Sequence, residues 1–149
     1  MKQENPIYNE YKISRDSIQL TDAYILRCKA ERFSDISHKM QFDLATQVGY
    51  AQERVSNNEI NGYMKVVVSL LVKDKKQEVA QFSVECKGIF CIKEEGIDKK
   101  EQEKRIQLQI VPQLLPYVRS AMSNLSSMLH IAPIILPTMD ILKSIQQNR

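Results

Sequence analysis

Residues 62–92, GYMKVVVSLLVKDKKQEVAQFSVECKGIFCI, form the stretch that decides the fold class. Its first part, residues 62–73, is dense in β-branched and aromatic residues, which favour a strand. After a polar interruption at residues 73–77, the side chains along residues 79–92 alternate in polarity. The alternation places Ala80, Phe82, Val84 and Cys86 on one face and Gln81, Ser83, Glu85 and Lys87 on the other. Two strands separated by a short polar turn predict an antiparallel hairpin.

The chain upstream, from Ser17 to about Arg54, repeats this period of two in two further segments. A turn-like segment at residues 34–38 separates them. The apolar positions are Ile18, Leu20, Tyr24, Leu26, Cys28 and Ala30 in the first segment, and Met40, Phe42, Leu44, Val48 and Tyr50 in the second. Four strands joined by short connections predict an antiparallel meander with one solvated face.

The pattern changes after Ile92. Residues 93–105, KEEGIDKKEQEKR, are a charged run that indicates either a solvated connection or the start of a helix. Residues 111–129, VPQLLPYVRSAMSNLSSML, then carry apolar side chains at alternating spacings of 4 and 3, which is the pattern of a helix with a packing seam. Because proline is tolerated at the first helical position, we expect the regular helix to begin at Pro116.

An apolar segment punctuated by prolines, residues 130–137, follows this helix, and Thr138 is then expected to cap a short last helix. Strands followed by helices define an α+β fold. We expect one domain over residues 1–149, with the polar residues 1–15 loosely held. The seam has two alternative partners: a second copy of the chain, which we favour, or the chain's own sheet.

Composition narrows the classes of function. Of 149 residues, 43% are hydrophobic and 26% are charged, and the formal net charge is +3. Basic and acidic side chains are interleaved, whereas a nucleic-acid-binding protein would cluster its basic ones on one face. The cysteines, Cys28, Cys86 and Cys91, match no zinc or disulfide pattern, which predicts a reduced protein of the cytoplasm. The sequence shows neither a signal peptide nor an apolar run of membrane-spanning length, so we expect no direct membrane insertion.

No pattern of residues points to catalysis. The glycines are scattered and form no phosphate-binding loop, and the G-x-S-x-G motif of hydrolases does not occur. The two histidines, His38 and His130, lack cysteine or carboxylate partners at metal-ligand spacing. We therefore expect a protein that is not an enzyme and that holds no cofactor and no metal.

Several segments, in their order along the chain, resemble the SecB family of bacterial protein-export chaperones. They are residues 79–92, which contain Gly88-Ile89-Phe90; residues 111–125, which contain Leu115-Pro116-Tyr117-Val118-Arg119; residues 134–142, IILPTMDIL; and residues 40–44, MQFDL. The resemblance implies a four-stranded antiparallel sheet with two helices. It also implies a homotetramer, built as a dimer of dimers, in which the long helix packs between the dimers.

The resemblance further implies an ATP-independent holdase, which binds unfolded preproteins in apolar grooves and keeps them competent for export. A flexible, methionine-containing apolar surface suits varied partners. The candidate client-binding residues are Met40, Phe42, Leu44, Leu125, Met128, Leu129, Ile131, Ile134, Ile135, Met139 and Leu142. The candidate residues of the oligomer interface are Leu115, Val118, Met122, Leu125 and Leu129.

Two departures from the family bear on the partner. Members that serve export are acidic and use acidic side chains on the first and fourth strands to dock the SecA motor. The corresponding positions here fall on Ser17, Thr21 and Ser83, with Gln81 beside them, and the chain is basic overall. SecB-like proteins also serve as dedicated chaperones of antitoxins, and this alternative stays open. So do two other classes of protein, a small enzyme of hot-dog type and an interaction or nucleic-acid adaptor.

Overall fold

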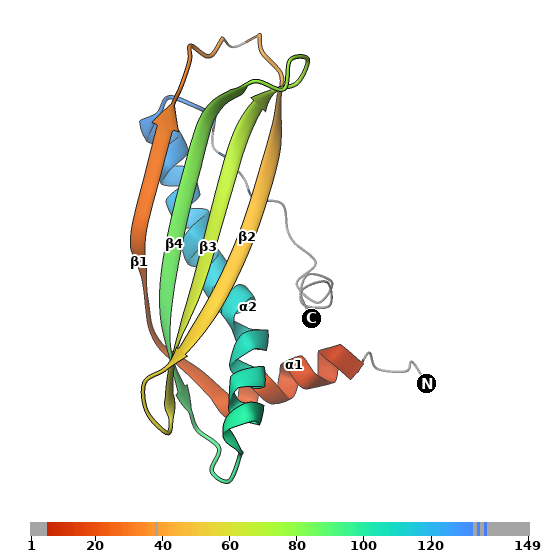
Figure 1. Ribbon diagram of the computed structural model, residues 1–149, viewed down its shortest axis with the longest axis vertical. Helices are drawn as coiled ribbons and strands as arrows, with labels where there is room; N and C mark the ends of the chain where they lie inside the picture. Colours follow the sequence, from red (N-terminus) through yellow and green to blue (C-terminus); the bar gives the residue numbers. More distant parts are fainter. Residues whose placement is uncertain (1–5, 38, 133, 135, 137–149) are drawn as a thin grey trace.

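The computed structural model describes residues 6–37, 39–132, 134 and 136, and its centre is one antiparallel sheet of four long strands (Figure 1). The strands are β1 (Ile18–Arg32), β2 (Phe42–Arg54), β3 (Glu59–Val72) and β4 (Glu78–Ile92). All four predicted strands are confirmed. Their order across the sheet is β1-β4-β3-β2, so the expectation of a simple meander was wrong for β1.

The position of β1 follows from the connection between the first two strands. Residues 33–37 and 39–41 lie across the end of the sheet, so β1 and β2 become the two opposite edges (Figure 1). Strands β2, β3 and β4 follow one another through hairpins, and β1 then lies beside β4. This is the strand order of a Greek key read from the C-terminal end. The turn-like segment at residues 34–38 is therefore a crossover connection rather than a hairpin turn.

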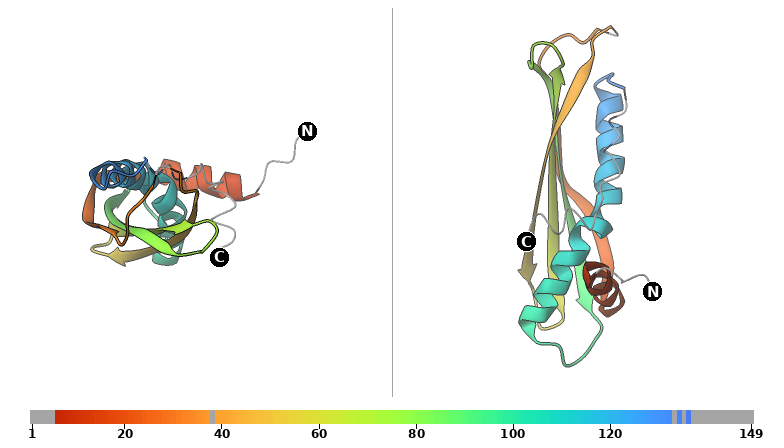
Figure 2. Two further views of the ribbon diagram at one scale, coloured as in Figure 1. Left: turned by 90° about the horizontal axis from the view of Figure 1, so that it is seen from above. Right: turned by 90° about the vertical axis from the view of Figure 1, so that its right-hand side faces the viewer.

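One face of the sheet carries the hydrophobic core. From Ile60 to Leu70 in β3 and from Ala80 to Ile92 in β4, the even-numbered residues are buried, and the odd-numbered residues between them are mostly partly exposed. Phe82, Phe90 and Ile60 are the largest side chains of the sheet that are fully buried. The long helix α2 (Lys99–Met128) covers this face (Figure 2). The opposite face is not covered by any helix of the described residues. The fold is thus α+β, as predicted.

Helix α2 is longer than the sequence suggested. It begins after Asp98, whose side chain accepts a hydrogen bond of 2.8 Å from the backbone N–H of Glu101. The charged run is therefore partly a connection and partly the first turns of a helix. The expectation that the regular helix begins at Pro116 was wrong, because Pro112 and Pro116 both lie inside it.

Both prolines remove a backbone donor from the helix interior, which usually bends or breaks a helix. Helix α2 accordingly changes direction along its length (Figure 2). Its buried side supplies Ile106, Ile110, Leu114, Val118 and Met122, all with no exposed surface. Because tertiary packing of one face provides most of the stability of helices in proteins, this contact with the sheet offsets the missing hydrogen bonds.

Two glycines bring α2 close to the sheet. Gly62 of β3 and Gly88 of β4 are direct cross-strand partners. A Cβ atom at Gly88 would lie 2.7 Å from Cδ2 of Leu114, and one at Gly62 would lie 2.9 Å from Cγ1 of Ile110. The pair therefore forms a shallow notch in the sheet, and only residues without a side chain leave room there for the helix.

The beginning of the described chain differs from expectation, because residues 6–15 belong to helix α1 (Pro6–Ser17) instead of a loose segment. Helix α1 packs against α2, where the side-chain amide of the fully buried Gln109 donates to the carbonyl of Tyr11 at 3.2 Å. A second polar contact joins the two helices, because Nζ of Lys104 lies 3.9 Å from Oε1 of Glu10.

The helical seam packs on the chain's own sheet, which is the alternative we did not favour. Leu115, Val118 and Met122 belong to the core of the single chain, with exposures of 3%, 0% and 0%. These three side chains are therefore not available to a second copy of the chain. The predicted oligomer interface is corrected for Leu115, Val118 and Met122, which are core residues instead. Leu125 and Leu129 are partly buried and pack against the same core. The last predicted helix, from Thr138, lies outside the described residues.

Candidate functional site

Helix α2 crosses the sheet diagonally, and polar contacts mark both ends of its path. Near its start, the carbonyl of Glu103 accepts from Gln52 at 3.0 Å, and Gln52 lies at the end of β2. Beyond its last turn, the carbonyl of Leu129 accepts from Nη1 of Arg32 at 3.1 Å, and Arg32 ends β1. The helix thus passes from the β2 edge to the β1 edge, and it moves away from the beginning of β2 (Figure 1).

An apolar groove lies on the inner face of the sheet where α2 has moved away. Its volume is about 860 Å³. Three parts of the chain form it: the crossover connection, the first residues of the sheet edge β2 with the facing part of β3, and the segment that follows α2. The lining residues are Arg32, Ile36, Ser37, Met40, Phe42, Leu44, Leu70, His130, Ile131, Ala132 and Ile134.

The floor of the groove follows from the register of β2 on β3. Phe42 and Leu44 occupy even positions of β2, on the face that β3 uses for its buried residues. Leu44 is directly opposite Leu70, which belongs to the core. Leu44 nevertheless keeps 43% of its surface exposed, and the groove that it lines includes no residue of α2. A core-facing position on an edge strand has here become an accessible one.

One wall of the groove depends on a buried serine near the end of α2. The Oγ of Ser126 donates to the carbonyl of Met122 at 2.7 Å and accepts from the backbone N–H of Ile134 at 3.1 Å. The backbone N–H of Ile131 also donates to the carbonyl of Ser126, at 3.0 Å. These bonds turn residues 130–132 and Ile134 back toward the sheet, where Ile134 is only 5% exposed. His130, with a φ of 55°, takes up the change of direction at the helix end.

Arg32 is the charged side chain of the groove lining. Besides its contact with Leu129, its Nε donates to the carbonyl of Ser34 at 3.3 Å. Arg32 therefore joins the end of β1, the crossover connection and the end of α2 at the rim. The rest of the lining is largely aliphatic, so the groove suits an apolar ligand better than a charged one.

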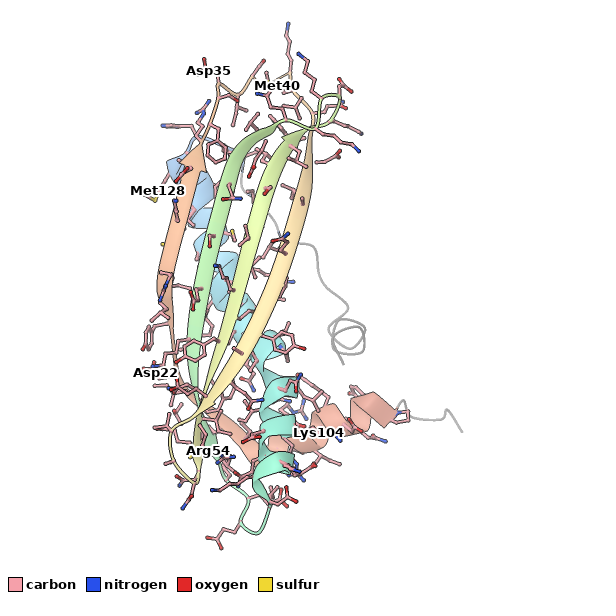
Figure 3. All side chains as sticks on the ribbon, in the orientation of Figure 1. Asp22, Asp35, Met40, Arg54, Lys104 and Met128 are labelled. Carbon is pink, nitrogen blue, oxygen red and sulfur yellow. The ribbon has the colours of Figure 1, made fainter. Side chains whose placement is uncertain are left out.

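The groove brings together five of the residues that the sequence predicted for client binding: Met40, Phe42, Leu44, Ile131 and Ile134. Leu125 and Leu129 pack against the core instead. Met128 is 75% exposed but lies on the β1 side of the molecule, away from Met40 and the start of β2 (Figure 3). Ile135, Met139 and Leu142 lie outside the described residues.

Sequence reasoning missed Arg32, Ile36, Ser37, Leu70, His130 and Ala132. Ile36 and Ser37 belong to the segment interpreted as a turn, and no periodicity shows that this segment crosses a groove. Leu70 follows the alternation of β3 and was treated as an ordinary strand residue. The detectable signal was the apolar Ile36 within an otherwise polar connection.

Within the described part of the chain, no group of His, Cys, Asp and Glu side chains has the geometry of a metal site. In the same part, no helix combines the length and the hydropathy needed to span a membrane. Of the free cysteines, Cys28 is exposed and Cys86 is buried in the core. Burial raises the pKa of the Cys86 thiol to about 11, so this thiol is a packing residue rather than a nucleophile.

Comparisons with known proteins relate the fold to a known class. No family model matches the sequence. An uncharacterized protein of Methanocaldococcus jannaschii is 32% identical over 91 residues, which are 59% of this chain and 57% of that protein. The chain therefore matches little more than half the length of this relative.

Among solved structures, the SecB-like chaperone Rv1957 of Mycobacterium tuberculosis, in complex with a ChAD peptide from the HigA1 antitoxin, has a TM-score of 0.76. The match covers 89% of this chain and 97% of that one, at 16% sequence identity. A protein of unknown function from Streptococcus agalactiae reaches a TM-score of 0.37 at 11% identity, over 80% of this chain and 95% of that one, which is too weak to carry an argument. The chain has a SecB-like fold, and this part of the resemblance is confirmed.

Proposed function

We propose that this protein is a SecB-like chaperone that holds an unfolded segment of a client polypeptide in the apolar groove. The observation that carries the proposal is the accessible groove itself, because ligand-binding sites are usually concave, mostly apolar cavities of about 300–1,000 Å³ with a few polar groups. Its volume of about 860 Å³ can accommodate several side chains. Holding a client in this way needs neither ATP nor a catalytic residue.

Of the two client classes, we favour a dedicated client such as an antitoxin over preproteins in general. The chaperone of like fold from Mycobacterium tuberculosis was solved with a peptide from an antitoxin, which supports this choice. The neutral residues at the positions expected to dock SecA support it as well. Both classes of client are made in the cytoplasm, where we expect the protein to act.

The proposal retains the dimer of dimers that the resemblance implies, with a different contact surface. Leu115, Val118 and Met122 are used inside the chain, so a partner copy must pack on other residues. Sedimentation of the purified protein gives the assembly directly and tests this part of the proposal separately from client binding.

A refolding assay with two matched variants tests the binding role. A slow-folding client is diluted from denaturant without ATP, and the recovery of its activity is followed with increasing amounts of this protein. The variants are Leu44→Ser, in the groove, and Leu26→Ser, on β1 and outside the groove; the two leucines are 43% and 37% exposed. Removing one apolar contact of this size should weaken client binding by about tenfold or more.

We expect the wild type and Leu26→Ser to stall refolding at similar concentrations, and Leu44→Ser to need far more protein. Equal activity of the two variants would remove the groove from the proposal. Refolding that is untouched by excess wild type would exclude a general holdase. The assay is then repeated with an antitoxin as client, and failure there as well would end the chaperone proposal.

A further inference from the structure

The two edges of the sheet are built differently, and only one of them is protected. Edge strand β1 has two register irregularities, at Leu20/Asp22 and Ile25/Arg27. It also carries charged side chains along its length, namely Asp22, Arg27, Lys29, Glu31 and Arg32. Bulges and charges are the usual means by which proteins prevent an edge strand from pairing with another chain.

Edge strand β2 lacks these features over most of its length. Its pairing with β3 runs without a register shift from Phe42↔Val72 to Arg54↔Ile60. Between Phe42 and Gln52 the sequence is FDLATQVGYAQ, in which Asp43 is the single charged residue and proline does not occur. In the described part of the chain, β2 pairs with β3 alone. It is therefore a long, regular edge that is open to a further strand.

The ladder shows which residues offer their backbone at this open edge. The N–H of Lys73 donates to the carbonyl of Gln41, and the N–H of Val55 donates to the carbonyl of Glu59. Odd-numbered residues of β2 therefore direct their backbone groups toward β3, because hydrogen-bonded and non-hydrogen-bonded pairs alternate in an antiparallel ladder. The even-numbered residues, Phe42 and Leu44 among them, direct theirs toward the open edge.

Phe42 and Leu44 thus combine two roles. Their side chains line the groove, and their backbone N–H and C=O groups lie at the free edge next to it. A peptide strand paired with them would direct every second side chain to the same face of the sheet, into the groove. Backbone pairing would then provide affinity without regard to sequence, and the groove would select apolar side chains at alternate positions.

From this juxtaposition, and resting on the function proposed above, we propose that the client binds as an added fifth strand. It is an extended segment, antiparallel to β2 beside Phe42 and Leu44, with apolar side chains at alternate positions. A second copy of β2 fits this place less well. Paired over the whole strand, it would set its own Gln52 and Arg54 opposite the groove, and these polar side chains cannot fill an aliphatic cavity.

Backbone N-methylation tests the pairing. The probe is a fluorescein-labelled peptide with leucines at alternate positions, separated by threonines and flanked by serines, and binding is followed by fluorescence anisotropy. One version is methylated on the leucine amides and the other on the threonine amides, so the side chains are identical. In the antiparallel arrangement only the leucine amides face β2, so their methylation should weaken binding by about tenfold or more, and threonine methylation should have little effect.

A preference in the opposite sense would overturn the antiparallel orientation, because only in a parallel pairing do the threonine amides face β2. Equal effects of the two methylated peptides would overturn the proposal, because a groove without backbone pairing does not distinguish them. If the wild type stalls client refolding but binds no extended peptide, strand addition is wrong and the proposed function stands. If it does neither, the proposed function itself is wrong.

A variant pair tests the same edge from the side of the protein. Thr46 is exposed, lies next along β2 at an even position, and is not part of the groove lining. Thr46→Pro removes a backbone donor at the open edge and leaves the β2–β3 ladder intact, whereas Thr46→Ala keeps the donor. We expect Thr46→Pro alone to weaken peptide binding by about tenfold. If the wild type is instead a dimer in sedimentation and Thr46→Pro dissociates it, the edge belongs to a second copy and the proposal fails.

Discussion

Gly88→Ala tests whether the glycine notch sets the distance between α2 and the sheet. The added Cβ would lie 2.7 Å from Cδ2 of Leu114, 3.0 Å from Cδ1 of Leu20 and 3.1 Å from Cε2 of Phe90. Leu114 and Phe90 are fully buried, so they cannot move into solvent. Overpacking of this kind costs about 1–3 kcal/mol, and the reduced entropy of the unfolded chain offsets about 0.4–1 kcal/mol. At the midpoints of these two ranges the net loss of stability is about 1.3 kcal/mol.

The chain offers a matched control in Gly49, where a Cβ would meet nothing within 4 Å. Thermal unfolding followed by circular dichroism should show a melting temperature about 3–5 °C lower for Gly88→Ala, since about 2–4 °C corresponds to each kcal/mol in a domain of this size. Gly49→Ala should melt at or slightly above the wild-type temperature. Equal melting of the two variants would refute the notch.

The same substitution in a Leu114→Val background identifies the side chain with which the new methyl group clashes. Leu114→Val removes the δ carbon that the new methyl group would meet. In this background Gly88→Ala should cost less, with a coupling energy of at least about 0.5 kcal/mol in a double-mutant cycle. Strict additivity would mean that the strain of Gly88→Ala arises elsewhere, and that α2 is not positioned by this contact.

Three further predictions concern the core, the groove wall and the thiols. Met122→Asp should unfold the chain rather than divide an assembly, because Met122 is fully buried within one chain. Circular dichroism and sedimentation distinguish the two results. A smaller species that is still folded would contradict this expectation. Ser126→Ala should leave the buried N–H of Ile134 without its acceptor, at a cost of about 1–3 kcal/mol in stability. We expect faster hydrogen exchange at Ile134 and weaker client binding. Unchanged exchange would refute the role of Ser126 in holding the groove wall. Thiol titration at pH 8 should modify the exposed Cys28 quickly and Cys86 only after unfolding. Because the pKa of Cys86 is raised from 9.0 to about 11 in the folded state, the contribution of this thiol to stability is complete below pH 9 and is lost as the pH rises toward 11. A stability that does not change over this pH range would contradict the burial of the thiol.

The sequence was most informative where burial alternates strictly. The period of two in β4 predicted that strand and its buried face, since core-facing residues on a strand recur at every second position. The β-branched and aromatic composition of β3 predicted that strand without naming its buried face. The strand order could not be predicted in the same way. Both edges carry a similar alternation, and the position of β1 depends on the crossover connection, whose short polar sequence could equally have formed a hairpin turn.

The helix shows a different limit of sequence reasoning. Local propensity places Pro112 and Pro116 near a helix start, because their effect in an interior is unfavourable by about 3 kcal/mol. Packing of the whole buried face against the sheet outweighs this preference, and it is not visible in a short window of sequence. The same packing explains the seam, because a 4, 3 spacing is the same whether the partner is another helix or a sheet.

The groove results from residues that look like local irregularities. Gly62 and Gly88 allow α2 to approach the sheet closely near its middle, and the two prolines go with a change of direction in the helix (Figure 2). The end of α2 consequently lies beside β1, where Arg32 contacts it, and Phe42 and Leu44 keep a core-facing orientation without a cover. Ser126 then turns the following segment back to form the opposite wall. A straight helix on a sheet without glycines would be expected to cover Phe42 and Leu44 as well. The glycines and prolines that weaken the local secondary structure therefore also create the accessible apolar surface.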